Sequence, residues 1–186
     1  PPYACAVPQR GMLMSNYRRF RVPGATWFFT VALAERGATH LTDRIDLLRA
    51  AYRATAGEHP IRCEAMVILP DHLHAVWTLP PGDADFSTRW RKIKGRFTHA
   101  TGLRGIQTHS KQEKGEAGLW QRRFWEHLIR DPDEEARAIA FCHSDPVRHG
   151  LVDAAAGWPF STVHRGLRTM VGGSPTLRAA SVAAVA

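Results

Sequence analysis

The stretch VILPDHLHAVWTL, from Val67 to Leu79, constrains the fold of this chain more than any other. It joins the ends of two runs, 61–69 and 72–79, whose apolar and β-branched residues are typical of β-strands. Only Pro70 and Asp71 separate the two runs. Because so short a connection joins antiparallel neighbours, the sequence predicts a β-hairpin at this point.

The second predicted strand carries two histidines, His72 and His74, on either side of Leu73. Side chains at i and i+2 share a face of a strand, so both imidazoles point one way, about 7 Å apart along the backbone. Leu73, Ala75 and Trp77 point to the opposite face, which we expect to pack on the core. Imidazole binds borderline divalent ions such as Mn²⁺ or Zn²⁺. Half-buried polar residues on the exposed face of a sheet are the more common reason for such a pair, so this pattern alone does not establish a metal site.

Five further segments have the residue pattern of regular elements. They are 26–35 and 122–130 as strands, and 44–57, a segment starting at Ser87 and a segment starting at Pro132 as helices. We expect Ser87 to cap its helix, and we expect the last helix to end near Asp145, because Pro146 disfavours helical geometry in the residue before it. Helices that alternate with strands and one hairpin predict the α+β class, an α/β sandwich with helices packed on an antiparallel sheet.

Positive charge points to the kind of partner. Lys and Arg number 25 against 17 Asp and Glu, a net charge of +8, which favours a polyanion: nucleic acid first, a membrane surface second. Basic residues cluster in RWRKIKGR (89–96) and QRRFW (121–125), where they can follow DNA phosphates, although a solvated helix face is the alternative. The candidate phosphate contacts are Arg18, Arg19, Arg89, Arg91, Lys92, Lys94, Arg96, Arg122 and Arg123.

Aromatic residues accompany the second basic cluster. Trp120 and Trp125 can stack on unpaired bases, but Trp125 lies in a predicted strand and is expected in the core. Trp158 and Phe160 are expected to pack the C-terminal segment against the domain.

The composition predicts one domain, residues 14–168, among the 186 residues. We expect residues 1–13 to be a disordered extension, 102–118 a mobile insertion and 169–186 a flexible tail. The three cysteines have no CxxC spacing, and neither a secretory signal nor an apolar run of roughly 20 residues is seen. A cytoplasmic protein without a membrane partner is the resulting expectation.

Separated motifs connect this chain to a known family. The segments LPDHLHAVWTLP, RRFWEHLIRD and DPVRHGLV closely resemble the REP-associated tyrosine transposases, bacterial enzymes of the single-tyrosine, His-hydrophobic-His (HUH) nuclease class. The likeness extends from about Ser15 to Arg165. It implies a ferredoxin-like HUH sandwich that binds single-stranded DNA hairpins of REP elements and nicks them. In that scheme His72 and His74 hold Mg²⁺ or Mn²⁺ at the scissile phosphate, and a helix tyrosine attacks to leave a 5′-phosphotyrosine.

The nucleophile of that scheme is missing. The family has a stretch like DYIHxNPVKHG, whereas residues 140–150 here are AFCHSDPVRHG, with Phe141 at the tyrosine position. Phenylalanine has no oxygen that can bond to phosphorus, so the chain is expected to bind DNA without cutting it. A deliberate Tyr→Phe exchange that traps uncleaved DNA is favoured, because the residues around Phe141 otherwise match the family pattern well. A natural loss, giving a catalytically dead DNA-binding regulator, stays open, as does a small RNA-binding domain in which the histidines are incidental.

Asp145 follows Phe141 by four residues, where the family usually has Asn. Because residues i and i+4 share a helix face, Asp145 can supply a third, oxygen ligand to the metal. A polar helix terminus before Pro146 is the alternative. His143 is a weaker candidate, and His149 is expected near DNA or on the surface, while Cys142 is expected to be a small packed residue. A monomer that uses its own strand and helix is the simplest assembly.

Overall fold

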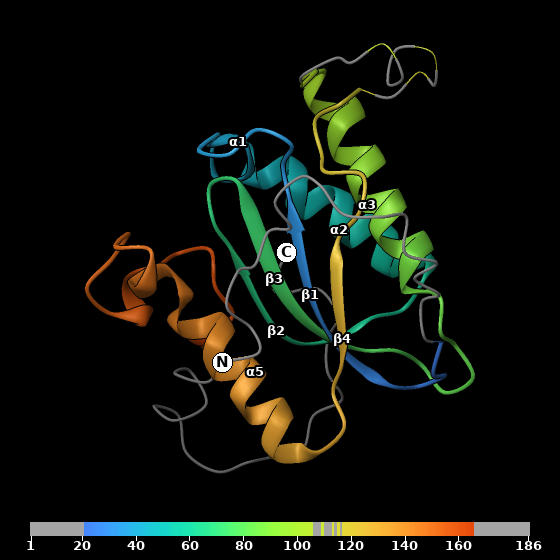
Figure 1. The fold of residues 1–186 in the computed structure, drawn as a ribbon, viewed down its shortest axis with the longest axis vertical. Helices are drawn as coiled ribbons and strands as arrows, with labels where there is room; N and C mark the ends of the chain where they lie inside the picture. Colours follow the sequence, from blue (N-terminus) through green and yellow to red (C-terminus); the bar gives the residue numbers. More distant parts are fainter. Residues whose placement is uncertain (1–20, 106–108, 110–112, 114, 116, 166–186) are drawn as a thin grey trace.

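A single antiparallel sheet of four strands forms the centre of the protein (Figure 1). The structure, a computed structural model, describes residues 21–105, 109, 113, 115 and 117–165. The order across the sheet is β2-β3-β1-β4. The strands are β1 (Thr26–Ala32), β2 (Arg62–Ile68), β3 (His72–Thr78) and β4 (Trp125–Leu128). All four predicted strands are therefore present, with shorter bounds than the sequence pattern indicated, and the antiparallel sheet of the α+β prediction is confirmed.

The predicted hairpin joins β2 and β3. Its strands pair from Arg62↔Thr78 to Ile68↔Leu73, and the amide of Leu69 donates to the carbonyl of His72 across the turn (2.8 Å). On its other side β3 pairs with β1 along its whole length. Neighbours on both edges and helices on both faces leave almost no part of β3 in contact with solvent.

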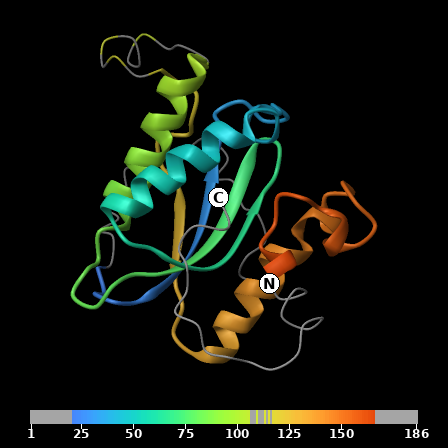
Figure 2. The ribbon, with the colours of Figure 1, turned by 180° about the vertical axis from the view of Figure 1, so that it is seen from behind.

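Helices lie on both faces of the sheet (Figures 1 and 2). The helices are α1 (His40–Asp43), α2 (Ile45–Glu58), α3 (Phe86–Thr101) and α5 (Pro132–Arg148), followed by the 3₁₀ turn η1 (Ala155–Gly157). Helices α2 and α3 pack against each other and cover one face, whereas α5 covers the other and contacts β2 and β3. This layering places α5 opposite the face of β3 from which the two histidines project.

Two helix boundaries differ from the predicted ones. Helix α3 begins at Phe86 and is capped by Asp85, whose carboxylate accepts from the amide of Thr88 (3.0 Å), so Ser87 is not the cap. Helix α5 begins as predicted at Pro132, but it continues through Pro146 to Arg148. A proline so close to the C-terminal end removes only one backbone donor from the helix, and its buried ring packs in return.

Alternation along β3 divides its side chains between two apolar clusters. Leu73, Ala75 and Trp77 belong to the larger cluster, between the sheet and α2 and α3, as predicted. In that cluster the rings of Trp77 and Trp90 stack with centroids 4.0 Å apart. A smaller cluster between the sheet and α5 contains Phe141 and Cys142, and Cys142 is the packed residue that was expected.

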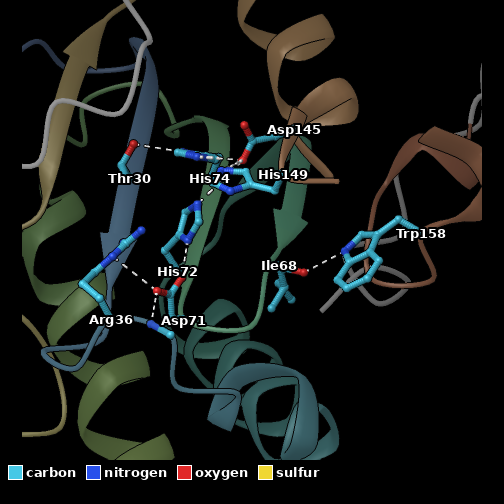
Figure 3. A network of polar contacts seen from close by, with 10 residues as sticks. Thr30, Arg36, Ile68, Asp71, His72, His74, Asp145, His149 and Trp158 are labelled. Carbon is cyan, nitrogen blue, oxygen red and sulfur yellow. Dashed lines mark hydrogen bonds and ion pairs between the residues drawn. The ribbon is translucent and has the colours of Figure 1, made fainter. Parts of the chain in front are cut away.

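The segment after α5 returns to the edge of the sheet at β2. The indole of Trp158 donates to the carbonyl of Ile68 (2.8 Å; Figure 3). The amide of Ile68 in turn donates to the carbonyl of Phe160 (2.9 Å). Both aromatic residues thus pack the end of the domain as predicted, and they cover the edge of β2.

Candidate metal centre and nucleic-acid surfaces

His72 and His74 project from β3 toward α5, and each ring is held through its Nδ1 atom (Figure 3). Nδ1 of His72 lies 2.5 Å from Oδ1 of Asp71, and Nδ1 of His74 lies 2.9 Å from Oγ1 of Thr30 on β1. Since a carboxylate can only accept, Nδ1 of His72 carries the proton and Nε2 keeps its lone pair. The Thr30 hydroxyl permits the same tautomer in His74.

Asp71, in the turn before β3, is itself fixed by the segment after β1. Its Oδ2 accepts from the amide of Gly37 (2.8 Å) and lies 3.3 Å from Nε of Arg36. Partial burial acts to raise the pKa of Asp71, but the hydrogen bonds from Gly37 and His72 and the nearby Arg36 charge bring it below its usual value. Asp71 is therefore an anion that orients His72.

Helix α5 brings the carboxylate of Asp145 to the free side of both rings. Its Oδ2 lies 3.3 Å from Nε2 of His74 and 3.7 Å from Nε2 of His72. All three residues are buried, and these three atoms have no hydrogen-bond partner in the described part of the chain. Burial acts to raise the pKa of Asp145, but its contacts with His72 and His74 lower it well below the ordinary range.

His149 closes the outer side of this cluster, where the sequence pattern had suggested only proximity to DNA or an exposed position. Its Nε2 lies 3.6 Å from Oδ2 of Asp145, and its ring centroid lies 5.1 Å from that of His72. Ligand atoms of His72, Asp145 and His149 all lie within 4.8 Å of one another. The signal in the sequence was the i,i+4 spacing of Asp145 and His149 near the end of the helix.

These residues fit a divalent cation. Buried polar atoms without partners are costly, and here two imidazole nitrogens and a carboxylate oxygen converge on one point. Burial lowers the pKa of His74, so its ring is neutral and able to bind a metal at neutral pH. His143, the weaker candidate, lies apart from this cluster, with Nε2 3.0 Å from Oγ1 of Thr162.

Phe141 lies one helical turn before Asp145 and faces the same centre. Its ring centroid is 5.3 Å from that of His74 and 5.7 Å from that of Phe28. The guanidinium carbon of Arg148 lies 4.6 Å from the centroid of the Phe141 ring. The side chain at the predicted nucleophile position therefore lies between the cluster of histidines with Asp145 and an exposed cation, but it offers only hydrocarbon.

The predicted basic residues separate into different environments. Arg89 is 1% exposed, and its guanidinium donates to the carbonyl of Pro60 (2.8 Å), the carbonyl of Asp85 (2.9 Å) and the carboxylate of Asp83 (2.7 Å). Its prediction as a phosphate contact is wrong, because its donors are occupied in the interior. Lys92 and Arg96 both pair with Glu58 on α2.

The other predicted cations within the described residues, Arg91, Lys94, Arg122 and Arg123, are exposed or half-buried. Arg91, Lys94 and Arg122 line an open groove of about 910 Å³ between α3 and residues 117–124, together with Arg21 and Arg104. Arg123 is exposed outside this lining, and Arg18 and Arg19 lie outside the described residues. Trp90 and Phe124 at the groove belong to the cluster beneath α2 and α3, so the groove lies on the sheet face opposite the histidines.

Both tryptophans of the second basic cluster differ from expectation. Trp120 is buried against Phe97, and its Nε1 donates to the hydroxyl of Thr98 (3.1 Å), so it does not offer a face to a base. Trp125, expected in the core, is 41% exposed. The reason is that β4 is an edge strand, and the smaller cluster does not extend over this residue.

The segment 102–118, predicted as an insertion, is described only in part. Its ends are joined, since the amide of Gly105 donates to the carbonyl of Ala117 (2.9 Å). The predicted N-terminal extension and C-terminal tail lie outside the described residues. Within the described ranges, no helix combines the length and apolar character needed to cross a membrane.

Comparison with known proteins identifies the family. No family model matches the chain. The REP-associated tyrosine transposase of Escherichia coli (strain K12) is 45% identical over 152 residues, which cover 82% of this chain and 84% of that protein. A Haemophilus influenzae protein assigned to the same group is 39% identical over 171 residues, 89% of this chain and 97% of its own length.

The fold agrees with that relationship. A solved structure of a REP-associated tyrosine transposase bound to a REP hairpin superposes with a TM-score of 0.76 at 40% identity, covering 90% of this chain and 96% of that one. The sequence identity, its extent and the shared sheet-and-helix arrangement thus agree with the motifs around His72, His74 and Phe141. This chain belongs to the REP-associated tyrosine transposase family.

Proposed function

We propose that this chain binds single-stranded DNA hairpins of the REP type at a site built around His72, His74 and Asp145. The observation that carries the proposal is that three buried polar atoms converge: Nε2 of His72, Nε2 of His74 and Oδ2 of Asp145. None of the three has a hydrogen-bond partner in the described part of the chain. The relative whose solved structure holds a REP hairpin supports the choice of DNA, as does the net charge of +8.

The ligands of a divalent ion, Mg²⁺ or Mn²⁺, would be His72, His74 and Asp145, with His149 as a further ligand from the exposed side. Such an ion withdraws charge from a phosphate and orients it for attack. Asp71 and Thr30 keep both rings turned toward the ion by holding their Nδ1 atoms. Because β3, α5 and the residue that follows α5 in one chain supply all four ligands, a monomer carries a complete site.

The chemistry of the family would be a nick in the hairpin DNA, with transfer of the strand to a tyrosine oxygen. In this chain Phe141 occupies the nucleophile position and has no hydroxyl. The protein therefore binds the hairpin and leaves the phosphodiester intact. Arg148 lies against the Phe141 ring, where its charge would favour the phenolate form of a tyrosine. The environment thus suits a phenol nucleophile even though the residue present cannot act as one.

A direct test compares this chain with the Phe141→Tyr variant. Both are incubated with REP-hairpin DNA carrying a single-stranded flank, in Mn²⁺ and in EDTA, and products are separated on denaturing gels. We expect both proteins to bind, and only the tyrosine variant with Mn²⁺ to give a nicked strand and a covalent protein–DNA adduct. Tyr52→Phe in the variant is the matched control: Tyr52 is a buried tyrosine of α2, on the other sheet face, and its loss leaves the adduct unchanged.

The other outcomes identify the alternatives. Tight hairpin binding by both proteins without cleavage by either would indicate a DNA-binding regulator in which Phe141 is native. The missing hydroxyl at position 141 is the observation that supports this alternative. Equal binding of hairpin DNA and unrelated RNA would contradict the proposed ligand.

A further inference from the structure

We propose that Trp125 forms a base-stacking subsite beside the metal-binding cluster, which receives an unpaired nucleotide of single-stranded DNA. The inference rests on the proposed DNA-binding function and adds the part of the protein that holds the single-stranded flank of a hairpin.

The sheet register places Trp125 on the same face as the histidines. Thr30 on β1 pairs with His74 on one side and with Trp125 on the other. Directly paired residues of antiparallel strands project to the same face, so Trp125 and His74 lie on one face two strands apart, about 10 Å. Nucleotides stacked at about 3.4 Å spacing cover that distance in about three steps, so the subsite is within reach of a strand held at the cluster.

Trp125 is the one tryptophan whose exposure stands out among the described residues. It is 41% exposed, and the other exposed large apolar side chains there are the aliphatic Val22, Val147 and Leu151. Exposure of a large indole costs free energy unless a ligand covers it. Every base has an apolar face that can stack on it, whatever the sequence.

The indole is fixed before any ligand arrives. Its ring packs edge-on against Phe28 (5.7 Å between centroids, 70° between planes), and it stacks in parallel on the ring of His127 (5.7 Å, 5°). His127 is anchored in turn by Glu134 at the start of α5, 2.7 Å from its Nε2. The rings of Trp125 and His127 thus form an ordered platform, so binding a base requires little additional ordering of side chains.

Phe28 joins this platform to the metal-binding cluster. Its ring stacks on His74 (5.4 Å, 27°) and meets the edge of Phe141 (5.7 Å). An apolar, aromatic floor therefore runs from Trp125 to the nucleophile position. The floor suits bases, whereas the phosphates would face His149 and Arg148, both exposed near the end of α5.

The experiment uses the full chain and three DNA probes: a REP hairpin with a single-stranded flank, the same hairpin without it, and the flank alone as an oligonucleotide. Variants are Trp125→Ala and Trp125→Phe, with Val22→Ala as the control for loss of an exposed apolar side chain. We expect Trp125→Ala to weaken binding of the flanked hairpin about 5- to 100-fold, Trp125→Phe to retain most of the affinity, and the blunt hairpin to bind all variants equally.

A second readout places the base. The adenine analogue 2-aminopurine is placed at successive flank positions, and its fluorescence is quenched when it stacks on an indole. Quenching at one position that disappears in Trp125→Ala supports the subsite, and the isolated flank shows this even if hairpins are not preferred. Equal binding of the flanked hairpin by wild type and Trp125→Ala, or equal losses for flanked and blunt hairpins, overturns it. Failure of the wild type to prefer any REP hairpin would instead contradict the proposed function.

Discussion

The carboxylate of Asp145 on α5 lies 3.3 Å from Nε2 of His74 on β3, and both atoms are buried. The two residues are far apart in sequence, and only the packing of α5 on the sheet brings them together. This contact joins the helix and the sheet at the candidate metal centre.

Removal of the carboxylate should abolish stabilisation by metal. Mn²⁺ at about 100 times its dissociation constant adds about 2.7 kcal/mol to the free energy of unfolding, which for a chain of this size raises Tm by about 5–10 °C. We expect Asp145→Ala to lose most of this increase and Asp145→Asn to need at least tenfold more Mn²⁺. Thermal unfolding with and without EDTA measures both. His143→Gln, on the same helix but outside the cluster, should respond to Mn²⁺ like wild type.

Acid should destabilise the metal-free protein through its buried histidines. Burial lowers the pKa of His74 and of His143 below the ordinary 6.5, so the unfolded chain binds protons more readily than the folded one. These histidines therefore do not reduce the free energy of unfolding above pH 6.5, but the free energy decreases as pH falls toward their lowered pKa values. Urea unfolding in EDTA between pH 7 and 5.5 should show this decrease, and His74→Gln should reduce its slope. A pH-independent free energy of unfolding in wild type would contradict it.

Asp71 should strengthen metal binding without being a ligand itself. Its carboxylate holds Nδ1 of His72 at 2.5 Å, and loss of such an outer partner weakens metal binding about 10- to 100-fold. We expect Asp71→Asn to show that loss in Mn²⁺ titrations followed by calorimetry. Asp46→Asn removes an exposed carboxylate on α2 and should leave the Mn²⁺ affinity unchanged.

Arg89 should contribute to the free energy of unfolding and not to the affinity for DNA. Arg89→Gln removes donors from two backbone carbonyls and separates the ion pair of the buried guanidinium with Asp83, and we expect it to lower the free energy of unfolding by about 3 kcal/mol. Its exposed neighbour on α3, Arg91, provides the matched Arg91→Gln control, which should change stability by less than about 0.5 kcal/mol. Urea denaturation distinguishes the two, and equal stabilities would refute the structural role.

Arg91 and Arg122 should contribute through phosphates if the groove beside α3 follows the hairpin stem. Each phosphate contact adds about 0.9 to the slope of log affinity against log salt concentration for duplex DNA. We expect the slope of the double Arg91→Gln, Arg122→Gln variant to fall by about 2, measured by fluorescence anisotropy over a salt series. Arg49→Gln, on α2 beside Asp46, removes one positive charge outside the groove and should leave the slope unchanged.

Local patterns in the sequence were sufficient for the hairpin and for the shared direction of His72 and His74. Side-chain alternation in a strand needs no tertiary information, and β3 places Leu73, Ala75 and Trp77 on the face opposite the imidazoles. The i,i+4 spacing likewise predicted that Asp145 shares a helix face with Phe141. The absence of a hydroxyl at position 141 is a property of the sequence alone.

Tertiary packing decided which of these groups meet and which basic residues reach the surface. Arg89 is interior because the carbonyl of Pro60, far away in the chain, accepts from it, and no helical periodicity contains that information. Trp125 is exposed because β4 is the edge strand, and His149 joins Asp145 because α5 continues through Pro146. A sequence determines dihedral preferences and side-chain alternation over a few residues. Burial and convergence depend instead on contacts between elements that are distant along the chain, and these form only when the whole sheet and its helices assemble.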